Sequence, residues 1–164
     1  MTKTLLIVYH SMTGGSHQMA KAACTGAQTE ADVIVHLRHA AEVHAADVLQ
    51  ADGYLFVTPE NLASISGVMK DFFDRTYYDV LDQVNGRPYA AMVCAGSDGH
   101  NAARQLERIA TGWRLRPIAE PLIVCTHAQS KEAIQAPKHI SQSDIDACQA
   151  LGEAMASGLV MGVF

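Results

Sequence analysis

The chain alternates short apolar runs with longer amphipathic stretches, and this alternation restricts its fold more than any other feature. Five runs have the length and the β-branched or aromatic content of strands: residues 5–9, 33–37, 54–58, 89–94 and 122–125. Five further stretches carry apolar residues at helical spacing: 15–28, 43–50, 65–78, 99–113 and 143–157. Continuous apolar strands separated by helices are typical of a parallel sheet covered on both faces. We therefore predict a doubly wound α/β fold.

Length and composition point to one domain, residues 1–164. An apolar fraction of 49% with 18% charged residues suits a single hydrophobic core in a chain of this size. The net charge of -5 and the lack of a basic run argue against a nucleic-acid partner. No apolar stretch approaches the length of a membrane-spanning helix, and the N-terminal run lacks the basic flank of a signal peptide. We expect a cytoplasmic protein with small-molecule partners and no membrane insertion.

The four cysteines are scattered, and none forms a Cys-x-x-Cys pair. Neither a zinc site nor a thioredoxin-like centre is therefore expected, and small buried apolar side chains are the simpler interpretation. Cys94 and Cys125 close apolar runs, which leaves reactivity near a ligand site as an alternative. Because no His-x-x-x-His or Glu-x-x-His spacing occurs, we predict no metal site.

The segment Ser11-Met12-Thr13-Gly14-Gly15-Ser16 follows the first predicted strand and opens the first predicted helix. Three hydroxyl groups, two glycines and the positive end of a helix can together surround a phosphate group. The segment has no Lys or Arg, which argues against a nucleoside triphosphate loop, and Gly-x-Gly-x-x-Gly occurs nowhere in the chain. A terminal phosphomonoester is the ligand that fits best, and an ordinary helix-capping turn is the alternative.

Ligands of doubly wound sheets bind beyond the carboxyl ends of the strands, where the strand order reverses. Three segments should meet there: His10–His17, Pro59–Ser66 and Ala95–His100. The region Thr126–Ile140, which contains Pro137 and several polar residues, is expected to be a long surface loop.

The second of these segments carries a resemblance. Thr58-Pro59 followed by Ser64-Ile65-Ser66-Gly67-Val68-Met69-Lys70, combined with the first loop, resembles the flavodoxin-like superfamily. It is most similar to the branch of NAD(P)H-dependent FMN reductases and NAD(P)H:quinone oxidoreductases, with specific motifs at 11–16 and 58–75 and a weaker similarity at 95–100. The resemblance implies a five-stranded parallel sheet of order 2-1-3-4-5 with helices on both faces.

The resemblance also implies bound FMN and a set of residues that hold it. The FMN phosphate would be bound by Ser11, Met12, Thr13, Gly14, Gly15, Ser16 and His17. The isoalloxazine ring would be bordered by Pro59, Glu60, Asn61 and Leu62, and its pyrimidine end by Ala95, Gly96 and Ser97. In this branch many members have an aromatic residue where this chain has Asn61, and neither ring-binding loop contains an aromatic residue. An uncovered ring face suits a second substrate that stacks on it.

The implied activity is that NAD(P)H, bound transiently, reduces the FMN, which then reduces a quinone, free flavin or another small acceptor. The alternatives are a flavodoxin-type electron carrier without a substrate site of its own, and a regulatory protein with a degenerate flavin site. His100 is a candidate proton donor, and no other catalytic residue is assigned. We expect a homodimer or homotetramer, because the adjacent aromatic residues Phe72, Phe73, Tyr77 and Tyr78 lie on two faces of one helix. The apolar tail Leu159–Phe164 either completes the core or bridges subunits.

Overall fold

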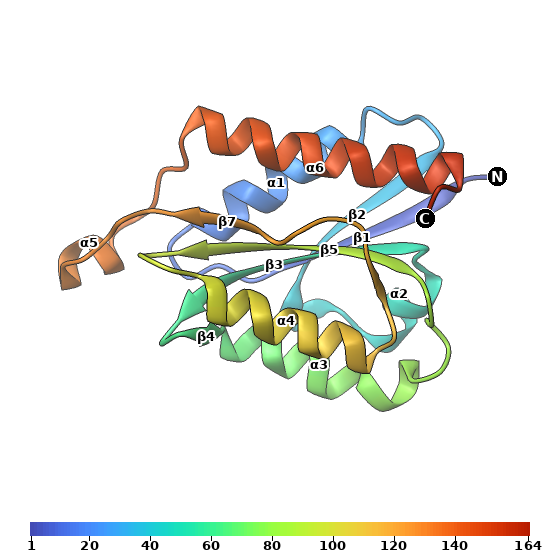
Figure 1. Cartoon of the computed structure of the whole chain (residues 1–164), viewed down its shortest axis with the longest axis horizontal. Coiled ribbons are helices and arrows are strands. Elements are labelled where there is room, and N and C mark those ends of the chain that lie inside the picture. Colours follow the sequence, from blue (N-terminus) through green and yellow to red (C-terminus); the bar gives the residue numbers. More distant parts are fainter.

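A central sheet separates two layers of helices in the computed structural model, which describes residues 1–164 (Figure 1). Its main strands are parallel and run in the order β2-β1-β3-β5, with β6 and β7 both paired to β5. The strands are β1 Lys3–Tyr9, β2 Val33–His39, β3 Gly53–Asn61, β4 Ser64–Ile65, β5 Pro88–Ala95, β6 Arg116–Pro117 and β7 Leu122–Cys125. The predicted order 2-1-3-4-5 is confirmed, because β5 and β7 are the fourth and fifth predicted strands. The short strands β4 and β6 bring the total to seven.

The helices cover both faces of this sheet, as predicted. Helices α1 and α6 lie on one face, and α2, α3 and α4 lie on the other (Figure 1). The bounds are α1 Gly15–Ala27, α2 Ala45–Gln50, α3 Gly67–Val80, α4 His100–Gly112, α5 Lys131–Gln135 and α6 Gln142–Met161, with a 3-10 turn at Ala40–Glu42. Every residue of β5 is buried between the two layers. This two-sided burial explains why the strands are continuous apolar runs. None of the helices has the combination of length and apolar character needed to cross a membrane.

Two segments that were predicted to be loops contain regular structure. Strand β3 continues through Pro59 to Asn61 and turns back into β4, so part of the second predicted loop is a β-hairpin. The predicted surface loop Thr126–Ile140 contains helix α5, whose first turn is capped by the hydroxyl of Ser130 accepting from the N–H of Ala133 at 3.1 Å. Proline and short polar runs in the sequence indicate loops. In these two segments, however, strand pairing and helix capping stabilise regular structure.

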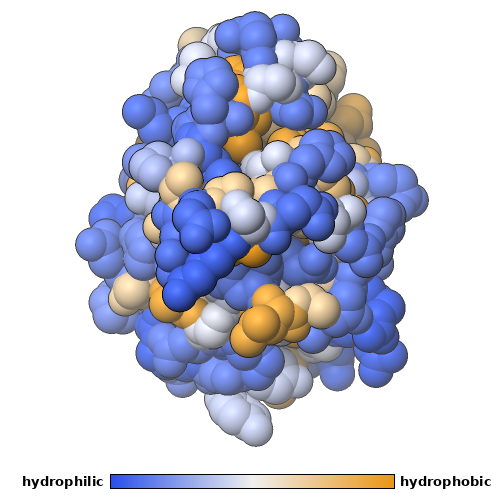
Figure 2. All heavy atoms as spheres, turned by 90° about the vertical axis from the view of Figure 1, so that its left-hand side faces the viewer, coloured by the Kyte–Doolittle hydropathy of each residue, from blue (hydrophilic) through white to orange (hydrophobic).

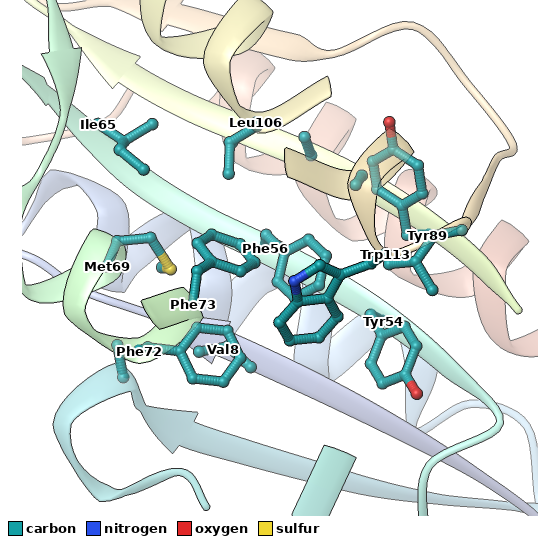
Figure 3. Close-up of a cluster of buried hydrophobic side chains, with 14 of the residues drawn as sticks. Val8, Tyr54, Phe56, Ile65, Met69, Phe72, Phe73, Tyr89, Leu106 and Trp113 are labelled. Carbon is teal, nitrogen blue, oxygen red and sulfur yellow. The ribbon is translucent and has the colours of Figure 1, made fainter. Parts of the chain in front are cut away.

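An aromatic cluster fills the space between the sheet and helices α3 and α4 (Figure 3). Phe56 on β3 lies at its centre, with ring centroids between 5.1 and 6.4 Å from five other aromatic rings: Tyr54, Phe72, Phe73, Tyr89 and Trp113. Of the four aromatic residues expected to form a subunit interface, Phe72 and Phe73 therefore belong to the core. Tyr78, by contrast, is 82% exposed.

The second core, on the opposite face of the sheet, depends on close packing of α1 against α6. A Cβ atom on Gly152 would lie 1.9 Å from the carbonyl oxygen of Ala23, so only glycine allows the two helix backbones to approach this closely. From the C-terminal tail, Leu159 is buried and Phe164 packs against the same core. These two tail residues complete the core, whereas Met161 and Val163 remain exposed.

Candidate functional site

The first turn of α1 contains backbone N–H groups that make no hydrogen bond within the protein. Gly14 is the N-cap residue in a left-handed conformation with φ +95°, and no side chain caps the helix. The hydroxyl of Ser11 accepts from the N–H of Gly14 at 2.9 Å, but no hydrogen bond uses the N–H groups of Gly15, Ser16 or His17. The positive end of the helix dipole therefore carries three donors without partners.

Ser16 adds a buried hydroxyl without a partner to these donors. The residue is 1% exposed, and its Oγ is the only buried side-chain nitrogen or oxygen in the structure that makes no hydrogen bond. An unsatisfied buried hydroxyl costs about 1–3 kcal/mol. Next to it, a Cβ atom on Gly15 would lie 2.6 Å from Sγ of Cys94, so only glycine allows α1 to begin this close to β5. A phosphate group, with several acceptor oxygens, would satisfy the hydroxyl and the free amides together.

The other helices longer than ten residues do not share this feature. Ser66 caps α3 by accepting from the N–H of Met69, and Ser141 caps α6 by accepting from the N–H of Asp144. Helix α4, like α1, begins after a glycine in the left-handed conformation. In α4, however, a side chain from a strand accepts hydrogen bonds from the N–H groups at the start of the helix. Among the long helices, α1 is thus the one whose first-turn N–H groups donate to no side-chain oxygen.

The carboxylate of Glu60 is the side-chain acceptor at the N-terminus of α4. Its Oε1 accepts from the N–H of Gly99 at 3.0 Å, and its Oε2 accepts from the N–H of Ala102 at 3.4 Å. A carboxylate at a helix N-terminus is stabilised by the helix dipole as well as by the hydrogen bonds. Glu60, predicted to border a flavin ring, therefore also ties the end of β3 to the loop that follows β5.

The hairpin between β3 and β4 has an unusual tip. Leu62 and Ala63 have φ values of +51° and +61°, a conformation that two-residue hairpin turns ordinarily reach with Asn-Gly. Left-handed non-glycine residues cost of order 1–3 kcal/mol each and persist where neighbouring contacts enforce them. Helix α4 supplies those contacts: Oε1 of Gln105 accepts from the N–H of Ile65 at 2.9 Å, and the Asn101 side-chain amide donates to the carbonyl of Ala63.

The tip of this hairpin presents free donors and apolar surface. No hydrogen bond uses the N–H of Leu62 or of Ala63. The side chain of Leu62 is fully exposed, and Met12 in the first loop is 69% exposed. The side-chain amide of Asn61 lies 3.0 Å from Sδ of Met12, so the first and second predicted segments are in contact.

The third predicted segment is connected to the loop after β7. The carbonyl of Ala95 accepts from the N–H of Thr126 at 2.9 Å, and the carbonyl of Gly96 accepts from the N–H of His127 at 2.8 Å. His100 begins α4 with an 81% exposed side chain, and its Nδ1 lies 2.6 Å from Oδ1 of Asp98. Hydrogen bonding to His100 lowers the pKa of the Asp98 carboxyl. Ser97, which directly precedes Asp98 in the sequence, is exposed.

All three segments lie at one end of the molecule, where the parallel strands terminate. This end faces the viewer in Figure 2 and is largely hydrophilic, with separate hydrophobic areas rather than one continuous patch. The structure thus brings the predicted residues to one edge of the sheet.

Sequence reasoning missed the residues that support the first loop. The side-chain amide of Gln18 donates to the carbonyls of Gly14 at 3.0 Å and Lys138 at 2.7 Å, and its Oε1 accepts from the N–H of Ile140 at 3.1 Å. No local pattern connects Gln18 with residues so distant in sequence, so only the tertiary structure shows this contact.

The buried cysteines have the inert character expected of small apolar residues. Burial raises the pKa of Cys94 to about 11 and that of Cys148 to about 12, and it also raises the pKa of Cys24. These thiols stay protonated at neutral pH and are poor nucleophiles.

Comparison with known proteins identifies the family. The model of the NADPH-dependent FMN reductase family matches residues 17–129, more than half of the chain. The chain belongs to this family. The predicted resemblance is therefore confirmed, and FMN and a nicotinamide donor are the cofactors that the family implies.

Individual relatives agree with this assignment. The chain is 33% identical over 95 residues to a flavodoxin from Aquifex aeolicus, a match covering 58% of this chain and 51% of that protein. It is 30% identical over 92 residues to an NAD(P)H dehydrogenase (quinone) from Acidithiobacillus ferrooxidans, covering 44% and 46%. The match spans about half the length of these curated relatives.

Solved structures confirm the flavodoxin-like fold. A flavodoxin from the domain Archaea superposes with a TM-score of 0.78 at 17% identity, covering 96% of this chain and 99% of that one. A WrbA-like flavodoxin protein from Agrobacterium tumefaciens superposes with a TM-score of 0.67 at 19% identity, covering 98% and 99%.

His10 connects the start of the first loop to the cap of α3. Its Nδ1 lies 2.7 Å from Oγ of Ser66. That hydroxyl accepts from the N–H of Met69 at 3.3 Å, and its own proton can be donated to Nδ1 of a neutral His10 imidazole. Burial, with a smaller contribution from the neighbouring His39, lowers the pKa of His10.

We predict that this lowered pKa makes the folded protein less stable in weak acid. The pKa of this histidine is lower in the folded than in the unfolded state, where it is about 6.5. Its contribution to the free energy of unfolding is therefore complete above pH 6.5 and is lost as the pH falls toward the folded pKa. The thermal unfolding temperature should therefore fall less steeply with decreasing pH in His10→Gln than in the wild type. His139→Gln, at an exposed position, is the control. Equal pH dependence in the wild type and His10→Gln would contradict the assignment.

Proposed function

We propose that this chain binds FMN at the site described above and uses NAD(P)H to reduce a quinone, free flavin or another small acceptor. The observation that carries the proposal is the open N-terminus of α1 with the unpartnered hydroxyl of Ser16. When bound, FMN supplies the redox chemistry, because it accepts electrons from a nicotinamide and passes them to a second substrate. The protein supplies binding, orientation and electrostatics.

The first loop would hold the phosphate of FMN. The N–H groups of Gly15, Ser16 and His17 and the hydroxyl of Ser16 are free to donate to it. The hydroxyl of Thr13, which has no hydrogen bond in the structure, lies on the same loop. Ser11 already supports the loop through the N–H of Gly14, so its contribution is to orient the backbone.

The β3–β4 hairpin and the loop after β5 would border the ring. The N–H groups of Leu62 and Ala63 are unused and can donate to ring heteroatoms, which stabilises negative charge on the ring. Gln105 and Asn101 hold this hairpin, and Glu60 holds the neighbouring loop. Donors fixed in advance cost little reorganisation when charge develops.

The ring face would be left open to the second substrate. Met12 and Leu62 are exposed apolar side chains, and no aromatic residue occurs in the three loops at this end. A planar acceptor or a nicotinamide can stack on an uncovered ring, and apolar side chains at its margin favour a substrate with apolar surface. His100, exposed and bonded to Asp98, remains a candidate proton donor for a reduced quinone.

A flavodoxin-type electron carrier is the second candidate. It is favoured by the 33% identity to the flavodoxin from Aquifex aeolicus. An electron carrier of this type would bind FMN equally well but would not itself oxidise a nicotinamide.

We also propose that the protein is a homodimer or homotetramer in the cytoplasm. Tyr78, which is 82% exposed, lies beside a cleft of about 420 Å³ between α3 and α4. Large exposed aromatic side chains are enriched at subunit interfaces.

The role of Ser16 gives a prediction with two opposite effects. In Ser16→Ala, removal of the unsatisfied hydroxyl should stabilise the flavin-free protein by about 1 kcal/mol, while affinity for FMN should fall about tenfold. The control is Ser66→Ala, because the Ser66 hydroxyl is fully bonded and its loss should destabilise the flavin-free protein by about 1 kcal/mol. Chemical denaturation and FMN fluorescence titration measure the two quantities. A Ser16→Ala protein that is less stable and binds FMN normally would refute this role.

The activity itself is tested with FMN-loaded protein. We expect it to oxidise NADH or NADPH in stopped-flow absorbance, and steady-state turnover with a quinone panel and with free FMN should identify the acceptor. Protein that binds FMN but oxidises neither nicotinamide would support the carrier function instead.

A further inference from the structure

We propose that Lys138 provides the positive charge for the phosphate group bound at the start of α1. The proposal rests on the proposed function, since it takes the FMN phosphate as the ligand of this loop. The first loop contains no cationic residue, and Lys138 is distant from it in sequence. The fold nevertheless places Lys138 against the loop.

The backbone of Lys138 is hydrogen-bonded to the first loop and to helix α1. Its N–H donates to the carbonyl of Thr13 at 2.8 Å, and its carbonyl accepts from the side-chain amide of Gln18 at 2.7 Å. The same Gln18 side chain binds the carbonyl of Gly14 and the N–H of Ile140. The segment from Lys138 to Ile140 is therefore part of the wall around the open N-terminus of α1.

The side chain of Lys138 starts beside the free amides. Its Cβ lies 3.6 Å from the position that a Cβ on Gly15 would take, and Gly15 is the first residue of α1. Lys138 is partly buried, whereas its neighbours Pro137 and His139 are exposed. A lysine side chain has enough reach to place its ammonium near an anion at this turn.

The ammonium of Lys138 is held in place without being neutralised. Nζ donates to the carbonyls of Ile134 at 2.8 Å and Ala136 at 2.6 Å, at the end of α5. It makes no salt bridge, and an ammonium has three donors, so one N–H is available to a ligand. Helix α5, whose end binds the ammonium, projects from the end of the molecule where the strands terminate (Figure 1).

The charge of Lys138 also acts on the groups beneath the loop. Burial raises the pKa of Cys94, whose Sγ lies against Gly15, and the positive charge of Lys138 lowers it. The negative charge of Asp144 raises it. The carboxylate of Asp144 accepts from the hydroxyl of Ser141 at 2.8 Å and does not bond Lys138. A phosphate dianion in a partly buried site is costly without an opposing charge, and Lys138 is placed to supply it.

The variant Lys138→Gln tests this role. A glutamine amide can still donate to a carbonyl at the end of α5, and the backbone contacts to Thr13 and Gln18 do not depend on the side chain. We expect FMN affinity to fall about tenfold or more, because a charge-assisted hydrogen bond is lost, and riboflavin affinity to stay unchanged. FMN binding should also become less sensitive to salt. Fluorescence titration of both flavins with the 164-residue chain measures these effects.

Two further variants control for charge and structure. Lys131→Gln makes the same change of charge at an exposed position on α5 and should bind both flavins like the wild type. Lys138→Arg should keep the preference for FMN over riboflavin. Of these three variants, only Lys138→Gln should have a reduced preference for FMN over riboflavin if the charge acts on the phosphate.

The results that would overturn the proposal are distinct. If Lys138→Gln keeps the wild-type preference for FMN over riboflavin, or loses affinity for both flavins equally, the charge of Lys138 does not act on the phosphate. If the wild type binds neither flavin, the proposed function fails as well.

Discussion

The unsatisfied N-terminus of α1 is the feature on which the rest of the site depends. Gly15 packs against Cys94 so closely that no side chain fits, and this contact fixes the first turn of α1 over the end of β5. In this turn, three backbone donors and the buried hydroxyl of Ser16 have no acceptor. A folded protein normally satisfies such groups, which is why we propose that a ligand completes the structure at this turn.

The surrounding contacts connect the loops of the site to the neighbouring strands and helices. Glu60 caps α4, and α4 in turn holds the strained tip of the β3–β4 hairpin through Gln105. On the other side, Gln18 joins the first loop to the segment at Lys138. The loops that would contact the phosphate and the ring are thus fixed by side chains from strands and helices. Such preorganisation lowers the entropy cost of binding and keeps donors aimed at the ligand.

Much of the fold was predictable because two-sided burial leaves a strong pattern in the sequence. The run from Leu122 to Cys125 coincides with β7, and the glycines and hydroxyls of residues 11–16 indicated the first loop. The sequence could not indicate that Glu60 caps α4 or that Lys138 lies beside Gly15, because these contacts join residues far apart in the chain. The hairpin tip was also unpredictable, since Leu62 and Ala63 adopt a conformation that their residue types disfavour.

Amide chemical shifts in two-dimensional NMR test most directly whether the N-terminus of α1 binds the phosphate of FMN. On addition of FMN, the N–H signals of Gly15, Ser16 and His17 should shift downfield, because each gains a charged acceptor. Riboflavin, which lacks the phosphate, should leave these three signals in place. If FMN binds and the three signals do not move, the phosphate lies elsewhere and the account is wrong.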